Sequence, residues 1–337
     1  MAKEITRLMV EVAISQGLKG MRQQFDRRVL RNAVEHGGRF SNGRYQKAAF
    51  QAMQEMLRTE DHPYFALCHQ VVTEVDERYL MNYVVNLAYE SWTQGAATIR
   101  RLEKEEKCNI PWCITLFTSK AGQRMTADTA AALIAQGMEI GVMAYAVYEE
   151  DARADLIHDL CDRFPKCSFT VFLPDEKITD ALLDNLSLPD NLAMVAMQPA
   201  GHFTSYEKLR KRHCLFGLCR DVDAASAERM MHQSDLRLQS IPNAPIVFYR
   251  LTENCPKDVA EQFSAFVWQQ KAHPSYPVFP IDLSCDLSRV DEIISDDACR
   301  LSLAPDGTYL LGEAKTPAEM KFPGTSLHDA VRQLLKK

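Results

Sequence analysis

The stretch WCITLFTSKAGQRMTADTAAALIAQGMEIGVMAYAVYEED, residues 112–151, decides the fold class of this chain. It contains two short apolar runs, Trp112–Phe117 and Ile140–Val147, and a helical segment, Thr126–Gln136, lies between them. A strand, a helix and a second strand in this order are typical of a βα unit with parallel strands. The stretch therefore predicts the start of a parallel sheet.

The same pattern repeats toward the C-terminus. Four more apolar runs follow: Ser168–Leu173, Ala193–Met197, Cys214–Cys219 and Ile246–Leu251. Helical segments separate most of them, for example Ala152–Arg163 and Ala224–Met231. Alternating strands and helices favour an α/β fold with a parallel sheet. Six such units suit an open or partial barrel as well as a doubly wound sheet.

The two ends of the chain have other patterns. The first hundred residues read as helices, and no strand signal precedes residue 110. Near the C-terminus, a strand is predicted around Val278–Leu283, a hairpin around Pro305-Asp306-Gly307 and a last helix at Ser326–Lys336. We therefore predict an N-terminal helical region at 1–108, a β/α region at 109–275 and a C-terminal extension at 276–337.

The composition is that of an ordinary globular protein, with 46% hydrophobic and 25% charged residues among 337. The sequence contains no membrane span and no secretory signal, and its ten scattered cysteines suit reduced thiols in a cytoplasmic protein. The net charge of −6 makes nucleic acid an unlikely partner. Arg22, Arg27, Arg28 and Arg31 lie close together, which indicates a solvated helix face or, alternatively, a site for a phosphate-bearing partner.

Several motifs of known chemistry are missing from the sequence. It has no phosphate-binding GxxxxGK[ST], no dinucleotide GxGxxG after a strand, no GxSxG and no HExxH. The cysteine pairs 108/113, 161/167 and 214/219 do not match common zinc or iron–sulfur spacing. We therefore predict no metal site.

Three groups of segments carry a resemblance to a known family. Asn86–Arg101 is followed by Asn109–Trp112; further on come Val247–Arg250, Phe279–Asp282 and Leu301–Gly307. In order and spacing, over roughly residues 64–330, they resemble radical S-adenosylmethionine (SAM) proteins of anaerobic gut bacteria. The resemblance implies a partial (β/α)6 TIM-like barrel with an N-terminal helical region and a SPASM-like C-terminal hairpin extension.

The departures from that family concern its cofactors. The family's first strand is followed by a CxxxCxxC loop that holds a [4Fe–4S] cluster, whereas Ile114–Gly122 runs almost directly into a helix at Met125-Thr126, and Cys113 lies inside the strand. Tyr148-Glu149-Glu150-Asp151 stands where the family has Gly-Gly-Glu-Pro, which receives the amino group of SAM. In the extension, Cys285 and Cys299 are too few for a cluster, and Leu311-Gly312-Glu313 replaces another expected cysteine. The resemblance therefore implies no [4Fe–4S] cluster and no cofactor, and it leaves SAM binding unsupported by any motif.

The candidate site residues follow the predicted strands, because barrels of this type place their sites at the carboxyl ends of the strands. Those ends carry Thr118, Ser119, Lys120, Tyr148, Glu149, Glu150, Asp175, Glu176, Gln198, His202, Arg220, Asp221, Tyr249 and Arg250. The ligand-binding candidates are Ser119, Lys120, Tyr148, Gln198, Arg220 and Tyr249, and the catalytic candidates are Glu149, Glu150 and His202. Two other interpretations stay open: solvated loop residues, and an acidic first helical turn at Glu149–Asp151.

The resulting hypothesis is a cluster-free radical SAM-like pseudoenzyme. It would act by binding a protein or peptide, for example an active radical SAM relative, or a small molecule in the vestigial pocket. One alternative is an enzyme of another class that reuses the barrel mouth, with Glu149, Glu150, His202 and Arg220 in acid–base or transfer chemistry. Another is a residual SAM or iron–sulfur protein with unusual ligands.

Overall fold

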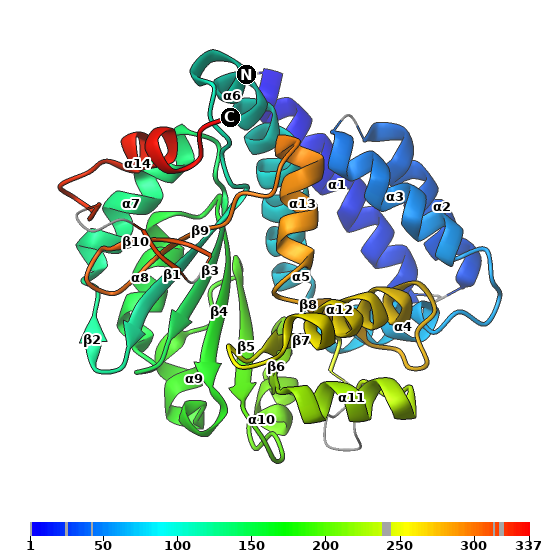
Figure 1. The fold of residues 1–337 in the computed structure, drawn as a ribbon. Helices are drawn as coiled ribbons and strands as arrows, with labels where there is room; N and C mark the ends of the chain where they lie inside the picture. The colour runs from blue at the N-terminus through cyan, green and yellow to red at the C-terminus, as the bar shows by residue number, and fades with distance from the viewer. Residues whose placement is uncertain (1, 24–25, 42, 238–243, 313, 317–319) are drawn as a thin grey trace.

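The computed structural model describes residues 2–23, 26–41, 43–237, 244–312, 314–316 and 320–337. Its N-terminal part is helical, as predicted. The elements are α1 (Ala2–Gln23), α2 (Arg27–Phe40), α3 (Arg44–Met56), α4 (Tyr64–Glu74), α5 (Glu77–Val85), the π-helix η1 (Asn86–Gly95) and α6 (Ala96–Glu106). In Figure 1 the blue helices α1, α2 and α3 form the side of the molecule that faces away from α7 and α8, whereas α6 lies near α14. None of the described helices is long and apolar enough to span a bilayer.

The arginine cluster of this region joins the helices to one another. The guanidinium of Arg22 donates to the carbonyl oxygen of Val75 at 2.6 Å. Arg27 and Arg31, both on α2, lie 5.6 and 5.4 Å from the ring centroid of Phe65 on α4. Cation–π contacts of this kind hold the guanidinium against the ring. Three of the four arginines therefore have a structural contact.

The strands form one curled sheet. They are β1 (Cys113–Lys120), β2 (Gln123–Arg124), β3 (Ala144–Glu149), β4 (Ser168–Pro174), β5 (Leu192–Gln198), β6 (Phe216–Val222), β7 (Ile246–Leu251), β8 (Phe279–Asp282), β9 (Leu301–Leu303), β10 (Tyr309–Leu311) and β11 (Ala314–Lys315). The order is β11-β10-β9-β1-β3-β4-β5-β6-β7-β8, and β2 pairs with β1. From β9 to β8 every pairing is parallel. The prediction of a mixed α/β fold with a parallel sheet is confirmed. The parallel part has eight strands: six from the region 109–275, and β8 and β9 from the C-terminal segment.

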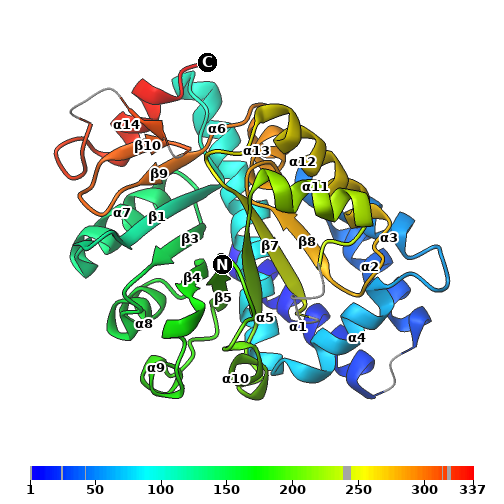
Figure 2. The same ribbon diagram turned by 60° about the horizontal axis from the view of Figure 1, so that its bottom comes forward.

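Most of the remaining helices cover the outer face of this sheet. They are α7 (Ala127–Glu139), α8 (Ala154–Arg163), the 3-10 turn η2 (Asp175–Lys177), α9 (Asp180–Leu186), α10 (Tyr206–Lys211), α11 (Ala224–Gln233), α12 (Lys257–Ala272), α13 (Asp286–Ser295) and α14 (Leu327–Leu334). Figure 2 shows the strands as an arc with α7, α8 and α9 outside it. The hydroxyl of Tyr145 on β3 donates to the carbonyl of Ile134 on α7, which assigns that side chain to the outer face.

The inner face of the sheet meets the helices that precede it. The hydroxyls of Tyr83 on α5 and Thr170 on β4 are 2.6 Å apart. Gly95 at the end of η1 approaches Gly141 just before β3 so closely that a Cβ on Gly95 would lie 2.3 Å from the carbonyl oxygen of Gly141. Only glycine allows such an approach of two backbones. The long helical run that ends at α6 is thereby fixed against the start of the second parallel strand.

The C-terminal residues complete one edge of the sheet. The predicted hairpin around Pro305–Gly307 is present, with β9 and β10 antiparallel. β9 also pairs in parallel with β1, so that Ile114 faces Leu301 across the ladder. The backbone N–H of Trp112, just before β1, donates to Asp291 on α13 at 3.1 Å. The segment 276–337 is thus joined to the start of the first parallel strand; its Glu313 lies outside the described residues.

Candidate functional site at the carboxyl edge of the sheet

A bulge at the end of β1 brings two hydroxyl groups to one carboxylate. The pairing of β1 with β3 shifts between Phe117 and Ser119. A bulge re-aims side chains, because two residues then oppose one on the partner strand. As a result Thr118 Oγ1 and Ser119 Oγ each donate to a different oxygen of Glu149, both at 2.7 Å. The local twist of β1 therefore builds a pocket for the Glu149 carboxylate.

Arg153 closes this pocket from the other side. Its Nη2 donates to Glu149 Oε2 at 2.7 Å, and its Nε lies 3.2 Å from both carboxylate oxygens. The same guanidinium donates to the carbonyls of Thr118 and Met125 at 2.7 and 2.9 Å. The backbone N–H of Asp151 adds a bond to Glu149 Oε1 at 3.2 Å. The network therefore ties the ends of β1 and β3 to the start of α8.

Glu149 has no solvent exposure, and both of its oxygens have several donors. A carboxylate held in this way is a structural anchor rather than an available base, since its lone pairs are already occupied. The interpretation of Glu149–Asp151 as the first turn of a helix is wrong, because α8 begins at Ala154 with Arg153 as its N-cap.

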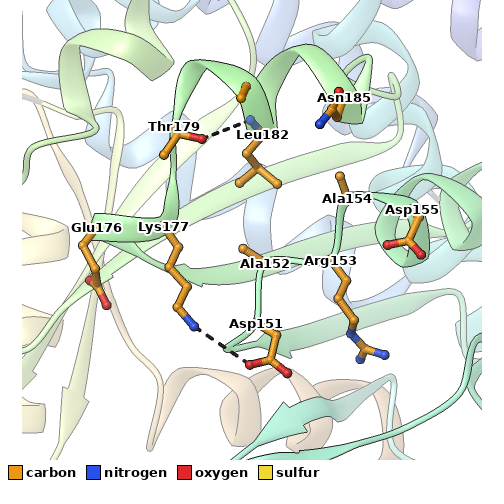
Figure 3. Close-up of a pocket in the computed structure, with 11 residues that line it drawn as sticks. Asp151, Ala152, Arg153, Ala154, Asp155, Glu176, Lys177, Thr179, Leu182 and Asn185 are labelled. Carbon is orange, nitrogen blue, oxygen red and sulfur yellow. Dashed lines mark hydrogen bonds and ion pairs between the residues drawn. The ribbon is translucent and has the colours of Figure 1, made fainter.

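A depression of about 820 Å³ lies beside this network, on the outer side of the sheet between α8 and α9. Its lining contains negatively charged side chains (Asp151, Asp155, Glu176) and positively charged ones (Arg153, Lys177). Thr179, Leu182 and Asn185 line it from the α9 side. Figure 3 shows Lys177 and Asp151 directed toward each other, with 3.9 Å between Nζ and Oδ1. The hydrogen bond from Arg124 holds the pKa of Asp151 below its ordinary value.

Glu150 precedes the first lining residue, Asp151, and makes its hydrogen bonds through and to the backbone. One of its carboxylate oxygens accepts from the N–H of Ala121 at 2.9 Å, and its carbonyl accepts from Lys177. These bonds hold the short β1–β2 turn against the end of β3. Glu150 thus lies next to Glu149 in sequence but in a separate hydrogen-bond setting.

Four aromatic side chains form a row across the inner face, called here the inner aromatic row: Phe117, Tyr148, Phe172 and Phe248. Tyr148 stacks on Phe172 with ring centroids 4.5 Å apart and 6° between the planes. Phe117 lies 5.1 Å from Tyr148, and Phe248 meets Phe172 edge-on at 5.3 Å. Aromatic pairs at such distances attract one another beyond simple burial. The row fills the middle of the curled sheet near its carboxyl edge.

A glycine makes room for the last member of this row. Gly217 on β6 has no side chain, and a Cβ there would lie 2.9 Å from the ring of Phe248. β5 and β6 separate Phe172 from Phe248, and Gly217 on β6 leaves space on the inner face that the ring of Phe248 occupies. Gly217 therefore sets the position of Phe248.

Charged side chains stand at the rim of the inner face. Asp221 and Arg250, paired across β6 and β7, form a two-point ion pair at 2.7 and 2.9 Å. Although burial lowers the pKa of Arg250, the hydrogen bond with Asp221 raises it above its ordinary value. On the other side, the exposed Lys120 has its Nζ 4.7 Å from the ring centroid of Phe117. The rim thus carries one paired cation and one cation on an aromatic ring.

Gln198, His202 and Arg220 form a second group, at the ends of β5 and β6. Arg220 Nη2 donates to the carbonyl of Gly201 at 2.6 Å, and Gln198 lies opposite Arg220 in the ladder and donates to the carbonyl of His202 at 3.4 Å. Their common partner is the loop 199–205 that follows β5. The structure therefore brings the side chains of Gln198 and Arg220 to the backbone of this loop, and His202, which is exposed, takes part only through its carbonyl oxygen.

The remaining candidates do not share one site. Tyr249 lies opposite Arg220 in the ladder, on the same outer face of the sheet, but its hydroxyl donates to the carbonyl of Leu236 and its ring packs against Phe263 of α12. Burial raises the pKa of its hydroxyl well above the ordinary value. Among the described residues, no hydrogen bond joins Glu149 or Glu150 to His202 or Arg220. The barrel-mouth set that the sequence suggests is therefore divided between β1–β3 and β5–β6.

All ten cysteines are described, and each is a free thiol. Burial raises the pKa of both Cys113 and Cys219 to about 12. Within the described ranges, no three His, Cys, Asp or Glu side chains form a group that could hold a metal ion.

Sequence reasoning missed Arg153, Gly217 and the depression between α8 and α9. Arg153 lies four residues after Glu149, and this spacing could have signalled an ion pair only if both residues had been assigned to one helix. In the structure Glu149 ends a strand, so the pair forms across a loop. Nothing in the sequence marks Gly217, because its role depends on a ring from another strand.

No family model matches the chain, and no curated protein matches it. Among solved structures, the chain is similar to Streptococcus suis SuiB bound to precursor peptide SuiA, with 12% identity, a TM-score of 0.49 and coverage of 71% of this chain and 69% of that one. SuiB bound to S-adenosylmethionine has 10% identity, a TM-score of 0.49 and coverage of 70% and 69%. Alanine racemase of Clostridium difficile 630 in complex with cycloserine has 12% identity, a TM-score of 0.33 and coverage of 68% and 57%.

Proposed function

We propose that this chain is a cluster-free protein of the radical SAM type that does not cleave SAM and acts by binding. The observation that carries the proposal is the closed network around Glu149. In the family that the sequence resembles, the ends of the first two barrel strands hold the cluster loop and receive the cofactor's amino group. Here the same ends are joined by Thr118, Ser119 and Arg153, all directed at Glu149.

The available donors do not fit a [4Fe–4S] cluster, which takes thiolate ligands. Cys113 is the cysteine closest in sequence to the missing loop; its side chain belongs to β1, and burial raises the pKa of its thiol. β1 ends at Lys120 and is followed by a turn of Ala121 and Gly122, and none of these three residues is a cluster ligand. Reductive cleavage of SAM needs an electron donor, and that chemistry belongs to the cofactor rather than to the barrel.

The test is reconstitution of the purified chain with iron and sulfide under anaerobic conditions, in the presence of a strong reductant and SAM. We expect less than stoichiometric iron after desalting, no absorbance band typical of a cluster and no 5′-deoxyadenosine. A cluster-containing radical SAM enzyme treated in parallel is the positive control. Stoichiometric iron together with 5′-deoxyadenosine would disprove the proposal.

An exposed apolar stripe supports a protein as the bound partner. Leu8, Met9 and Val12 share one face of α1 and are 59%, 64% and 47% exposed. Clustered exposed apolar side chains on a soluble protein often mark an interaction surface. The test is a photo-crosslinking amino acid at Met9 in cells. We expect one reproducible crosslinked species that Val12→Asp removes and that Gln51→Asp, on the exposed face of α3, leaves unchanged. Diffuse crosslinks that neither variant changes would count against a protein partner.

A small polar molecule is the second candidate, and the depression between α8 and α9 favours it. Its volume of about 820 Å³ lies within the usual range for ligand sites, and its lining offers a polar ligand a positive charge at Lys177 and a negative charge at Asp155. Native mass spectrometry of the freshly purified protein tests this candidate. Extra mass that Lys177→Ala removes would support it, and a bare-chain mass in both proteins would exclude a tightly bound molecule.

A further inference from the structure

Arg220 is a buried arginine at the carboxyl end of a central strand. It is the fifth residue of β6, and only 6% of its surface is exposed. An arginine is always charged at ordinary pH, and a buried charge is normally paired with an opposite one. The surroundings of Arg220 therefore decide whether its charge is structural.

The hydrogen bonds of this guanidinium are incomplete. Its Nη2 donates to the carbonyl of Gly201 at 2.6 Å, and its Cζ lies 4.8 Å from the ring centroid of Phe203. Its Nε is buried without a hydrogen-bond partner, and no carboxylate of the described residues forms a salt bridge with it. A carbonyl dipole and a ring face together satisfy only part of a group with five N–H donors.

Asp175 and Asp221 are the carboxylates that interact electrostatically with Arg220. Asp221 is held at two points by Arg250. Asp175 accepts hydrogen bonds from the backbone and side chain of both Thr204 and Ser205, at 2.5 to 3.1 Å. Both acids are therefore committed to other partners, and burial lowers the pKa of Arg220.

The loop over Arg220 is anchored more firmly at its C-terminal end than in its exposed part. Thr204 and Ser205 are fixed by Asp175, whereas Pro199, Ala200, Gly201 and His202 are exposed. Gly201 has a φ of 86°, and a Cβ on it would meet nothing within 4 Å. This part of the loop is held by the Gly201 carbonyl on Arg220, by a long bond of 3.4 Å from Gln198 to the His202 carbonyl, and by the buried ring of Phe203. A displacement of Gly201 and Phe203 would expose the Arg220 guanidinium to solvent and leave the hydrogen bonds of Thr204 and Ser205 to Asp175 in place.

We propose that Arg220 is the recognition group of an oxyanion site, closed in this structure by the loop 199–203, for a ligand that carries a phosphate or carboxylate group. The Gly201 carbonyl oxygen occupies a position that an anionic oxygen would take. A guanidinium binds an oxyanion at two points more strongly than it binds a neutral carbonyl, and Nε together with Nη2 offers that fork. Gln198, opposite Arg220 on β5, supplies an amide at the same edge.

The site lies at the carboxyl edge of a parallel sheet, where ligands of α/β folds bind. It involves neither the Glu149 network nor the exposed stripe of α1. The inference therefore goes beyond the proposed function and does not depend on it: an iron-containing protein would leave the Arg220 site untouched, and an absent anion site would leave the cluster-free proposal untouched.

The experiment follows the arginine Nε–Hε signals by NMR after selective ¹⁵N labelling of arginine. Inorganic phosphate and sodium acetate are titrated separately, with sodium chloride at matched ionic strength as the reference. Arg220→Lys assigns the Arg220 signal by removing it, and Arg101→Lys, at an exposed pair with Glu105, is the matched control. We expect a saturable downfield shift of the Arg220 signal with phosphate, acetate or both, and none with chloride.

The two anions distinguish the ligand chemistry. A response to phosphate alone assigns a phosphate group, a response to acetate alone assigns a carboxylate, and a response to both assigns a general oxyanion. A signal that moves with none of them, or that follows chloride equally, overturns the proposal.

Two loop variants keep the test decisive even if one of them folds poorly. Phe203→Ala, or the milder Phe203→Leu, removes part of the loop that covers Arg220. The variant should therefore bind phosphate more tightly, while its free energy of unfolding without phosphate should fall. Arg220→Lys should weaken phosphate binding about tenfold, measured by calorimetry, because it removes a two-point hydrogen bond to a charged group. An Arg220 that only anchors the loop predicts the opposite: no anion response, and no gain from either Phe203 variant.

Discussion

Arg153 donates to both carboxylate oxygens of Glu149, and the pair joins the end of a strand to the start of a helix. Glu149 has no exposure, while the side chain of Arg153 is 20% exposed. Removing one member of a buried pair leaves the other charge unpaired, which costs about 3–5 kcal/mol. We expect Glu149→Ala to lower the free energy of unfolding by that amount, as measured by urea denaturation.

The neighbouring Glu150→Ala is the control for this prediction. Glu150 is partly exposed and makes a single side-chain bond, so its loss should cost less than about 1 kcal/mol. The double variant Glu149→Ala/Arg153→Ala should cost less than the sum of the single changes, because it leaves no unpaired charge. Equal costs for Glu149→Ala and Glu150→Ala would contradict the anchoring role.

Gly217 and Phe248 make a second prediction possible. A Cβ at position 217 would lie 2.9 Å from the Phe248 ring and 3.1 Å from the carbonyl oxygen of Ile246. Overpacking a close-packed interior costs about 1–3 kcal/mol. We expect Gly217→Ala to destabilise the protein by this amount in thermal or urea unfolding.

Phe248→Leu should partly relieve the effect of Gly217→Ala, since it removes the ring that the new methyl group meets. The coupling is measured by a double-variant cycle. Additive costs would show that the ring does not limit the space at position 217.

The inner aromatic row is expected to be the least replaceable part of the inner face. Phe172 is 1% exposed and contacts a ring on either side. Replacing a buried phenylalanine by alanine removes its contacts and leaves a cavity, at a cost of about 3–5 kcal/mol. Phe172→Ala should therefore lower the stability more than Gly217→Ala does. A loss below about 1 kcal/mol would mean that the row is not packed as described.

Asp291 should make the stability fall as the pH rises. Burial raises the pKa of its carboxyl to about 8, whereas an unfolded chain has an aspartate pKa of about 3.9. Between these values the folded protein binds the proton and the unfolded chain does not. The free energy of unfolding should therefore decrease from about pH 4 to about pH 8, by up to about 1.4 kcal/mol per pH unit, and should then level off.

Asp291→Asn isolates this effect, because the amide is neutral at every pH and its oxygen still accepts from the N–H of Trp112. Urea denaturation across this pH range should show a flatter dependence for Asp291→Asn than for the unchanged protein. The same slope in both would assign the pH dependence to other groups.

The cysteines should differ in reactivity toward an alkylating reagent. The thiolate is the reactive form, so burial protects a thiol both by access and by its raised pKa. Cys68, Cys113, Cys255 and Cys285 are all partly exposed, but burial raises the pKa of Cys68 to about 11 and that of Cys113 to about 12, and it raises the pKa of Cys255 without such a large shift. A short pulse of iodoacetamide followed by peptide mapping should label Cys255 and Cys285 first. Early labelling of Cys219, which is fully buried, would contradict the packing of the inner face.

Periodicity predicted the alternation of strands and helices, because apolar runs of this length report burial between two layers. The predicted run Ile246–Leu251 has the same bounds as the observed strand β7, and the hairpin after Leu303 follows from its Pro-Asp-Gly turn. The pairing of β9 with β1 could not be read from the sequence. Leu301–Leu303 is too short to signal a parallel partner, and its neighbour lies at the other end of the β/α region.

The candidate site was predictable only as a list of residues that follow strands. The sequence places Ser119 and Glu149 in that list, but their contact depends on the bulge after Phe117. It also places Tyr249 there, although the side chains of successive strand residues point to opposite faces. Deciding which of two neighbours faces inward requires the register, and the register of Arg220 with Gln198 and Tyr249 is a property of the folded sheet.

The parallel pairing of β1 with β9 also sets an order of events during synthesis. β1 leaves the ribosome before β3 to β8, whereas its partner Leu301–Leu303 emerges only after all of them. Until then one edge of β1 offers unpaired N–H and C=O groups, and such an edge is a template for another chain. Contacts so distant in sequence also slow folding, because the loop between them must close first. The nascent protein therefore passes through a stage with an open sheet edge, in which a chaperone or a neighbouring chain has access to β1.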